Sequence, residues 1–209
     1  MTVATLEELV AIPSVSSDPA RREDVERAAA WLAARLGGMN GRVVPTAGHP
    51  LVLAEWLGAE GAPTILVYAH YDVQPVGEAA AWLTPPFEPA VRGERLYGRG
   101  TSDDKGPMLA ALGAIEQVLE ERGRLPVNVR ILLEGEEEIG SPNLEPALLA
   151  NRDALRADVA VSADGAMWSA EQPSLNVAAR GQVVVAVVPT TDVGRLRPIP
   201  LRRTATASP

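Results

Sequence analysis

An alternation of short strand-like segments with longer helical segments constrains the fold of this chain more than any other feature. The strand-like segments occupy residues 65–69, 127–133 and 158–162, and the first of them is apolar throughout. Continuous apolar segments of this length are typical of strands buried on both faces of a parallel or mixed sheet. The pattern therefore predicts an α/β domain with a helix-covered mixed or parallel sheet at its centre.

Helical periodicity fills the two gaps between these strands. Residues 105–123 place apolar side chains on one face at helical spacing, namely Met108, Leu112, Ile115 and Leu119. Residues 144–155 form the second predicted helix, with Asn143 as its N-cap, because an asparagine side chain accepts hydrogen bonds from the first turn. Together they complete the order strand, helix, strand, helix, strand.

The segments before residue 65 predict two helices and a hairpin. A short helix is expected at 5–11 with Thr5 as its N-cap, and a longer one at 18–36, which the two glycines that follow would end. Residues 42–44 and 51–56 are expected to be strands that pair as a hairpin or edge ribbon.

Two further segments set the predicted limits of the folded part. Residues 73–94 are rich in proline and predict an ordered loop, whereas residues 177–188 resemble one or two strands. From Pro189 onward the chain is rich in arginine and proline without periodicity, so no structure is predicted there. The chain is thus divided into a folded part at 1–188 and an irregular tail at 189–209. A change of reading frame near that boundary would explain the tail.

Charge and composition exclude several classes of partner and site. The formal net charge of −8 argues against nucleic acids and anionic membranes, because both attract clustered Lys and Arg. The chain contains no cysteine, so a metal must be bound by His, Asp or Glu. Glu7 and Glu8 lie where a signal peptide needs an apolar core, and no apolar run is long enough to span a bilayer. A soluble, cytoplasmic protein is therefore expected.

A glycine-rich loop precedes the first of the helices between the strands. Gly98, Gly100 and Gly106 bracket two adjacent acids, Asp103 and Asp104. Glycine admits backbone conformations that are closed to other residues, so such a loop can direct a short acidic side chain toward a fixed point. We therefore predict that Asp103 is directed at a metal ion.

Acidic and imidazole side chains also gather where the predicted strands end. His70 and Asp72 follow the first strand, Glu134–Glu138 ends the second, and Asp164 follows the third. Ligands of open α/β sheets bind beyond the carboxyl ends of the strands, so these groups are expected to lie together with Asp103. Carboxylates packed together are unstable unless a cation neutralises them, and without cysteine that cation is expected to be Zn, Mn or Co.

Each of these groups has an alternative interpretation when it is taken alone. A single histidine is more often structural than a ligand, adjacent acids can cap a helix, and an acidic run is usually a solvated surface. Calcium binding is disfavoured because Glu134–Glu138 lacks the ligand spacing of an EF-hand. A dinucleotide site is disfavoured because Gly98 and Gly100 lack a third glycine at the required spacing and no predicted strand directly precedes them. The joint occurrence of the groups in this order favours a metal site.

The combined motifs resemble the M20 family of zinc-dependent peptidases and deacylases, above all its dipeptidase (carnosinase-like) branch. The matching segments are 68–75 (YAHYDVQP), 82–89 (WLTPPFEP), 96–106 (LYGRGTSDDKG), 134–141 (EGEEEIGS) and 162–165 (SADG). The resemblance covers residues 1–188. It implies a helix-covered mixed or parallel sheet of the di-zinc phosphorylase/hydrolase-like peptidase type.

The resemblance also implies a set of metal ligands. His70, Asp103, Glu138 and Asp164 would bind two divalent metal ions, with zinc expected first and manganese or cobalt as alternatives. Asp103 would bridge the two ions, while His70 and Asp164 would bind the first and Glu138 the second.

Two further residues receive roles from the same resemblance. Glu137 would be the general base toward a water molecule that bridges the two metal ions, and Asp72 would orient the His70 imidazole. A cis peptide bond is implied between Asp103 and Asp104. The implied reaction is the hydrolysis of a peptide bond, above all in a dipeptide, or of an N-acyl amide bond.

The resemblance finally implies a lid domain and a later return to the catalytic domain, which would supply a last His ligand to the second metal. This chain has two histidines, and His49 matches no ligand position, so it is expected to be a loop residue. We therefore expect a chain truncated before the lid domain, whose full-length relatives form homodimers. Two hypotheses follow: an M20-type hydrolase of small peptides or N-acyl amino acids, or an inactive remnant that folds and binds at most one metal.

Overall fold

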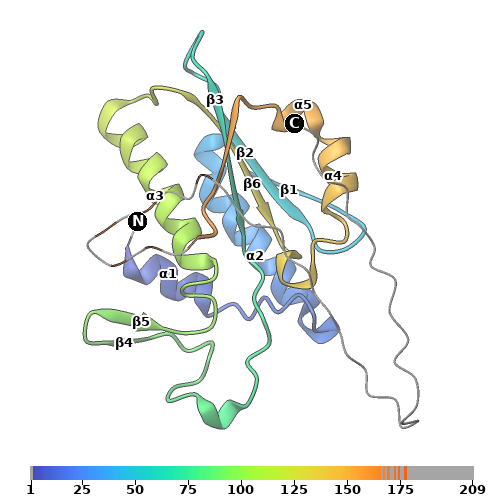
Figure 1. The fold of residues 1–209 in the computed structure, drawn as a ribbon, viewed down its shortest axis with the longest axis vertical. Helices are drawn as coiled ribbons and strands as arrows, with labels where there is room; N and C mark the ends of the chain where they lie inside the picture. The colour runs from blue at the N-terminus through green and yellow to red at the C-terminus, as the bar shows by residue number, and fades with distance from the viewer. Residues whose placement is uncertain are drawn as a thin grey trace, which may run out of the picture. The chain divides into compact units, whose positions relative to one another are not determined.

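The computed structural model places the three predicted strands side by side in a five-stranded mixed sheet. The strand order is β1 (Arg42–Val44), β2 (Leu51–Trp56), β6 (Asn128–Glu134), β3 (Thr64–His70) and β7 (Val159–Ser162) (Figure 1). Strand β3 runs parallel to β6 and β7, and β2 runs antiparallel to β1 and β6. The predicted α/β class is confirmed, and so is the hairpin of β1 and β2.

The structure describes most of the chain. The described residues are 2–165 and, beyond them, 167, 169, 172, 174 and 177. The chain divides into two units, Met1–Ser174 and Leu175–Pro209, and of the second only the exposed Val177 is described. Apart from that valine, the strands predicted over 177–188 lie outside the described residues, as does the predicted tail.

Five α-helices and four 3-10 turns complete the described fold. The helices are α1 (Val3–Val10), α2 (Arg22–Arg35), α3 (Lys105–Arg122), α4 (Leu144–Ala150) and α5 (Arg152–Leu155) (Figure 1). The 3-10 turns are Pro19–Arg21, Leu36–Met39, Ala79–Ala81 and Glu137–Ile139. Among these helices, none combines the length and the apolar character that a bilayer-spanning segment requires.

Side chains alternate between the two faces of the sheet, and each face is covered by its own helices. On β6, Val129, Ile131 and Leu133 belong to the larger core, together with residues of α2 and α3. Leu132 belongs to the smaller core, against which residues of α4 and α5 pack. Successive side chains of a strand point to opposite faces, so a strand with apolar residues at consecutive positions contributes to both cores.

The predicted helices are present, and the differences lie at their ends. Helix α1 begins at Val3 because Thr2, and not Thr5, is its N-cap: the Thr2 hydroxyl accepts a hydrogen bond from the Thr5 N–H at 3.3 Å. Helix α3 matches its prediction and ends at Gly123, whose φ of 67° lies in the left-handed region that stops a helix.

Two predicted helices are interrupted. The helix predicted at 18–36 is α2 with a 3-10 turn at each end. The helix predicted at 144–155 is divided into α4 and α5 at Asn151, whose Nδ2 donates a hydrogen bond to the Ala147 carbonyl oxygen at 2.9 Å. Asparagine side chains compete for the hydrogen bonds of the helix backbone, which accounts for the break.

A second, two-stranded sheet was not predicted. Strands β4 (Ala90–Arg92) and β5 (Arg95–Tyr97) form a hairpin that turns at Gly93, where φ is 61°. The predicted loop at 73–94 therefore contains one strand of this hairpin. Strand β5 directly precedes Gly98, so the expectation that no strand precedes the glycine loop was wrong.

Candidate metal centre

The candidate metal centre lies at the carboxyl ends of the parallel strands, where three predicted ligands come together. His70 is the last residue of β3, Asp164 follows β7, and Asp103 comes from the glycine loop before α3. One ligand atom from each lies within 4.8 Å of the other two. His70 Nε2 is 3.0 Å from Asp103 Oδ1 and 3.8 Å from Asp164 Oδ2. Residues far apart in the sequence meet here because parallel strands end at one edge of a sheet.

The hydrogen bond at the other ring nitrogen defines the tautomer of His70. Nδ1 lies 3.1 Å from the backbone carbonyl oxygen of Asp72, and a carbonyl oxygen only accepts, so Nδ1 carries a hydrogen. In the neutral ring, Nε2 then turns a lone pair toward the Asp103 carboxylate. Two acceptors that face each other need a proton or a cation between them. A divalent metal ion meets that need, so the nitrogen and oxygen donors of this group fit such an ion.

The surrounding charges favour a positive charge at His70. Burial alone would lower its pKa, but the hydrogen bond and charge of Asp72, together with the charges of Asp104 and Glu137, raise the pKa to about 10. An environment that stabilises an imidazolium also stabilises a metal cation, because both effects are electrostatic.

Asp72 links this histidine to the segment that carries Glu137 and Glu138. Its side chain is fully buried, and Oδ1 lies 3.4 Å from His70 Nδ1. Oδ1 also accepts a hydrogen bond from the backbone N–H of Glu137, and Oδ2 accepts one from that of Glu138, each at 3.2 Å. The resemblance suggested only the contact with His70, because nothing in the local sequence relates Asp72 to a turn 65 residues later.

Glu137, the predicted general base, opens a 3-10 turn and faces the histidine. Its Oε2 lies 3.9 Å from His70 Nε2, and its side chain is 38% exposed. Burial raises the pKa of Glu137 and His70 lowers it, while the carboxylates of Glu138 and Asp164 raise it further. A carboxylate with a raised pKa is a better proton acceptor near neutral pH.

Glu138, the fourth predicted ligand, does not join the other three. Its Oε2 accepts a hydrogen bond from Gln74 Nε2 at 2.8 Å. In the part of the chain that the structure describes, the group of close ligand atoms consists of His70, Asp103 and Asp164. The structure therefore brings together three of the four predicted ligands and ties the fourth to Gln74.

The acidic run at the end of β6 contains two buried glutamates besides the two for which functions were predicted. Glu134 is 1% exposed and accepts hydrogen bonds from Tyr68 Oη at 2.5 Å and Ser141 Oγ at 3.1 Å. Glu136 is 5% exposed and accepts from the backbone N–H and the side-chain Nδ2 of Asn143. A solvated acidic surface is therefore the wrong interpretation for these two glutamates.

Asn143 and His49 both donate hydrogen bonds to the Glu136 carboxylate. Asn143 occupies the N-cap position of α4 but makes no capping hydrogen bond, because its side-chain amide donates to Glu136. His49 lies in the loop between β1 and β2, as predicted, and donates its backbone N–H to Glu136 at 3.0 Å. Its Nε2 lies 3.0 Å from the Ser16 carbonyl oxygen, so this histidine has a structural role.

Close packing explains two of the glycines that bracket Asp103. Gly100 has a φ of 87°, and a Cβ atom there would lie 2.7 Å from Val73 Cγ1. A Cβ atom at Gly106 would lie 2.0 Å from the Thr101 carbonyl oxygen. Only glycine fits either position without displacing its neighbours.

Asp104 holds the histidine backbone and does not cap the helix. The peptide bond between Asp103 and Asp104 is cis, as the resemblance implied. Asp104 occupies the N-cap position of α3 without a side-chain capping bond, and its Oδ2 accepts a hydrogen bond from the His70 N–H at 3.2 Å. Helix capping is therefore the wrong interpretation of this acid.

Lys105 is a structural residue that the sequence did not single out. It is fully buried, and its Nζ donates hydrogen bonds to the carbonyl oxygens of Leu9 at 2.9 Å and Ile12 at 2.7 Å. These bonds attach the start of α3 to the end of α1. Burial lowers the pKa of Lys105 to about 7.

A comparison with protein families decides the assignment. Residues 66–198 match the family described as peptidase family M20/M25/M40. This chain belongs to that family. All the predicted site residues, from His70 to Asp164, lie within the matched range, and the predicted M20 resemblance is confirmed.

Curated relatives of this M20 chain are longer than it is. It is 34% identical over 204 residues to the Beta-Ala-His dipeptidase of Rattus norvegicus, which covers 88% of this chain and 41% of the relative. It is 34% identical over 196 residues to the Cys-Gly metallodipeptidase dug1 of Schizosaccharomyces pombe, which covers 86% of this chain and 41% of the relative. The chain thus spans roughly two fifths of the length of these relatives.

Solved structures of the same family share the fold. An M20 family metallo-carboxypeptidase from Sulfolobus solfataricus, Sso-CP2, superposes with a TM-score of 0.74 at 38% identity, over 82% of this chain and 39% of that one. Human carnosine dipeptidase 1 superposes with a TM-score of 0.71 at 34% identity, over 79% of this chain and 38% of that one. The predicted fold class of the M20 chain is confirmed.

Membership of this metallopeptidase family implies divalent metal ions as cofactors. Among the residues that the structure describes, the group that fits such an ion is His70, Asp103 and Asp164. Imidazole nitrogen and carboxylate oxygen are ligands that zinc, manganese and cobalt all accept, so the donor set leaves the metal open among these three.

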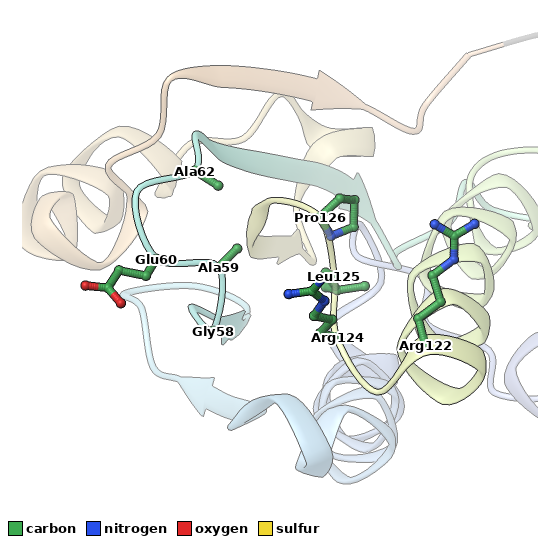
Figure 2. A pocket seen from close by; sticks show the side chains of 8 residues that line it. All are labelled: Gly58, Ala59, Glu60, Ala62, Arg122, Arg124, Leu125 and Pro126. Atoms are coloured by element: carbon green, nitrogen blue, oxygen red, sulfur yellow. The ribbon is translucent and has the colours of Figure 1, made fainter.

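The M20 chain also has a surface pocket at the opposite end of the sheet, before the amino ends of β3 and β6. Its volume is about 590 Å³. It is lined by Gly58, Ala59, Glu60, Ala62, Arg122, Arg124, Leu125 and Pro126 (Figure 2). Figure 2 shows Arg124 pointing toward Ala59, while Arg122 and Glu60 point in other directions. None of the predicted site residues lines this pocket.

Proposed function

We propose that this chain carries the metal centre of an M20 hydrolase that cleaves dipeptides, with N-acyl amides as the alternative substrate class. The observation that carries the proposal is the convergence of His70 Nε2 with the carboxylates of Asp103 and Asp164. Dipeptides are favoured because the relatives are named as a Beta-Ala-His dipeptidase and a Cys-Gly metallodipeptidase.

In this proposal the site holds two divalent metal ions, with zinc as the first choice. His70 and Asp164 would bind one ion, Glu138 the other, and Asp103 both. Bound there, the ions would lower the pKa of a water molecule between them and polarise the carbonyl group of the scissile amide.

Glu137 is the proposed general base. It would take a proton from the attacking water molecule and deliver it to the leaving nitrogen. Three observations support this role: its Oε2 lies 3.9 Å from His70 Nε2, its backbone is held by Asp72, and its pKa is raised by burial.

Asp72 is the proposed positioning residue. It holds the His70 ring with Nε2 toward the metal and holds the backbone of Glu137 at the same time. A buried carboxylate that accepts hydrogen bonds from two segments restricts both of them.

A second candidate function is the binding of a single metal ion without turnover. It is favoured by one specific observation, that Glu138 stands apart from the three close ligand atoms. The chain's other histidine, His49, is engaged with Ser16 and Glu136, so it does not complete the second position.

The deciding experiment measures metal content and hydrolysis together. The purified chain is loaded with Zn²⁺, Mn²⁺ or Co²⁺, its metal content is determined, and dipeptides and N-acyl amino acids are screened as substrates. We expect two ions per chain, and we expect Glu137→Gln to lower the rate by about 10²–10⁴-fold with unchanged metal content. Glu60→Gln, an exposed glutamate at the far pocket, is the matched control and should retain the full rate. One ion or none, with no turnover on any substrate, would support the second candidate.

A further inference from the structure

We propose that Gln74 is a positioning residue that orients Glu138 toward the second metal ion. The inference rests on the proposed function, because it assumes that Glu138 is a ligand. Gln74 lies in the segment that follows β3, four residues after His70, and its side chain is exposed.

One nitrogen of Gln74 contacts Glu138 at two atoms. Its Nε2 donates to Glu138 Oε2 at 2.8 Å and to the Glu138 backbone carbonyl oxygen at 3.2 Å. A side-chain amide nitrogen carries two hydrogens, so it serves both acceptors without competition between them. The amide thereby connects the carboxylate of Glu138 to its own backbone.

Asp72 holds the same residue from its other side. The Glu138 backbone N–H donates to Asp72 Oδ2 at 3.2 Å. Glu138 is therefore fixed at its backbone nitrogen, its backbone oxygen and one carboxylate oxygen. Among the described residues, nothing hydrogen-bonds to Oε1, which leaves that oxygen available to a cation. A ligand whose conformation is fixed before binding loses less entropy when the ion arrives.

The chemistry of an amide suits this position. A hydrocarbon cannot donate a hydrogen bond, and a carboxylate would repel Glu138. A lysine or arginine would neutralise the negative charge that attracts the metal ion. A neutral donor fixes the carboxylate and leaves its charge in place.

Gln74 could instead compete with the metal ion, and its removal would then change the metal affinity in the opposite direction. If the amide competed with the metal ion for Glu138, its removal would strengthen metal binding. If it orients the ligand, its removal weakens binding. The sign of the change therefore distinguishes the two roles.

The test is a Zn²⁺ titration of the metal-free full chain by competition with a chromogenic chelator. We expect Gln74→Leu to weaken the second binding step by about 10-fold or more and to leave the first step unchanged. An unchanged or stronger second step in this variant overturns the proposal. A melt of the metal-free protein checks that the exposed substitution leaves folding intact.

The chain offers a matched control on α3. Gln117 Nε2 donates to Glu121 Oε1 at 2.7 Å, which is the same pair of side chains on an exposed surface. Gln117→Leu should change neither binding step. An equal loss in both glutamine variants would indicate a general effect on the protein and would overturn the role of Gln74.

Glu138→Gln separates this inference from the proposed function. If that variant abolishes the second step while Gln74→Leu leaves it intact, the two-metal proposal stands and the role of Gln74 fails. If the wild-type chain binds one zinc ion, or if Glu138→Gln has no effect, the two-metal proposal fails and the role of Gln74 fails with it.

Discussion

The two ends of the central sheet differ in what they do with polar side chains. At the carboxyl ends of β3 and β6, buried carboxylates tie separate segments together and leave ligand atoms facing one another. At the opposite end there is a pocket of about 590 Å³, but its arginines, Arg122 and Arg124, point in different directions (Figure 2). The comparison of the two ends indicates that the candidate site is recognised by polar groups that are held in place and converge, and not by the volume of a pocket.

Near the pocket, the fixed polar group is the side chain of Asn128, and its hydrogen bonds go to neighbouring backbone atoms. Asn128 Oδ1 accepts from the Ala59 N–H, and its Nδ2 donates to the carbonyl oxygens of Ala59 and Ala62. These bonds hold the connection between β2 and β3. At the carboxyl ends of the strands, by contrast, Asp72 holds the ring of His70 and the backbone of Glu137, and the side chains of these two residues face each other at the candidate metal centre.

The largest expected effect on stability comes from a substitution in β6, the strand that runs between the two ends of the sheet. Ile131 lies in the middle of β6 and is 1% exposed. Ile131→Ala should lower the free energy of unfolding by about 2–5 kcal/mol, because it leaves a cavity in the larger core. Urea unfolding measures this. Val91→Ala, at an exposed position on β4, is the control and should cost much less. Two separate unfolding transitions would show that the ends of the sheet fold independently.

The next largest effect is expected on zinc affinity, and only from a substitution at the carboxyl ends of the strands, where the candidate metal centre lies. Asp72→Ala removes the acceptor of the Glu137 and Glu138 N–H groups and should weaken zinc binding by about 10–100-fold. Chelator competition measures it. Asp158→Ala is the control at the pocket end, since Asp158 Oδ2 accepts from the Thr64 N–H at 2.8 Å. Equal losses of zinc affinity in both variants would remove the distinction between the two ends.

Lys105 predicts a pH dependence of stability. Its pKa is about 7 in the folded chain and 10.5 as an ordinary lysine, so between these values the unfolded chain binds a proton that the folded chain does not. The free energy of unfolding should therefore rise with pH in this window, by up to about 1.4 kcal/mol per unit, and should be independent of this group below pH 7.

The variant Lys105→Met isolates the contribution of this lysine to the pH dependence of the free energy of unfolding. Lys105 is the chain's one lysine, so few other groups titrate in the same window. Urea unfolding at several pH values between 7 and 10 should show the slope in the wild type and its loss in the variant. Identical slopes would mean that the buried amine keeps its proton.

The smallest effect is expected at the pocket. Arg124 is exposed, so Arg124→Ala should change the free energy of unfolding by less than about 0.5 kcal/mol. It should leave zinc affinity unchanged as well. A marked loss of zinc affinity in this variant would place the pocket and the metal centre in one functional unit.

Local patterns in the sequence predicted the strands of the central sheet, the main helices and the family. The central strands β3, β6 and β7 were predicted to within one residue at each end, because each contains consecutive apolar residues. Burial does not account for the apolar character of β7, since all four of its residues are exposed in the described structure. The short hairpin of β4 and β5 was missed, since three-residue strands in a proline-rich stretch have no such signature. The order of the motifs carried the family assignment.

Only the tertiary structure decided which members of the acidic run are buried and which face the site. The run contains four glutamates that the local sequence does not distinguish, namely Glu134, Glu136, Glu137 and Glu138. Their environments are set by partners that lie elsewhere in the chain. Tyr68 binds Glu134, and Asp72 binds the backbone of the last two glutamates. Contacts between residues some 65 positions apart arise from strand pairing, which no local pattern encodes. The sequence therefore predicted a set of candidate ligands, and the packing of the strand ends decided which of these residues meet.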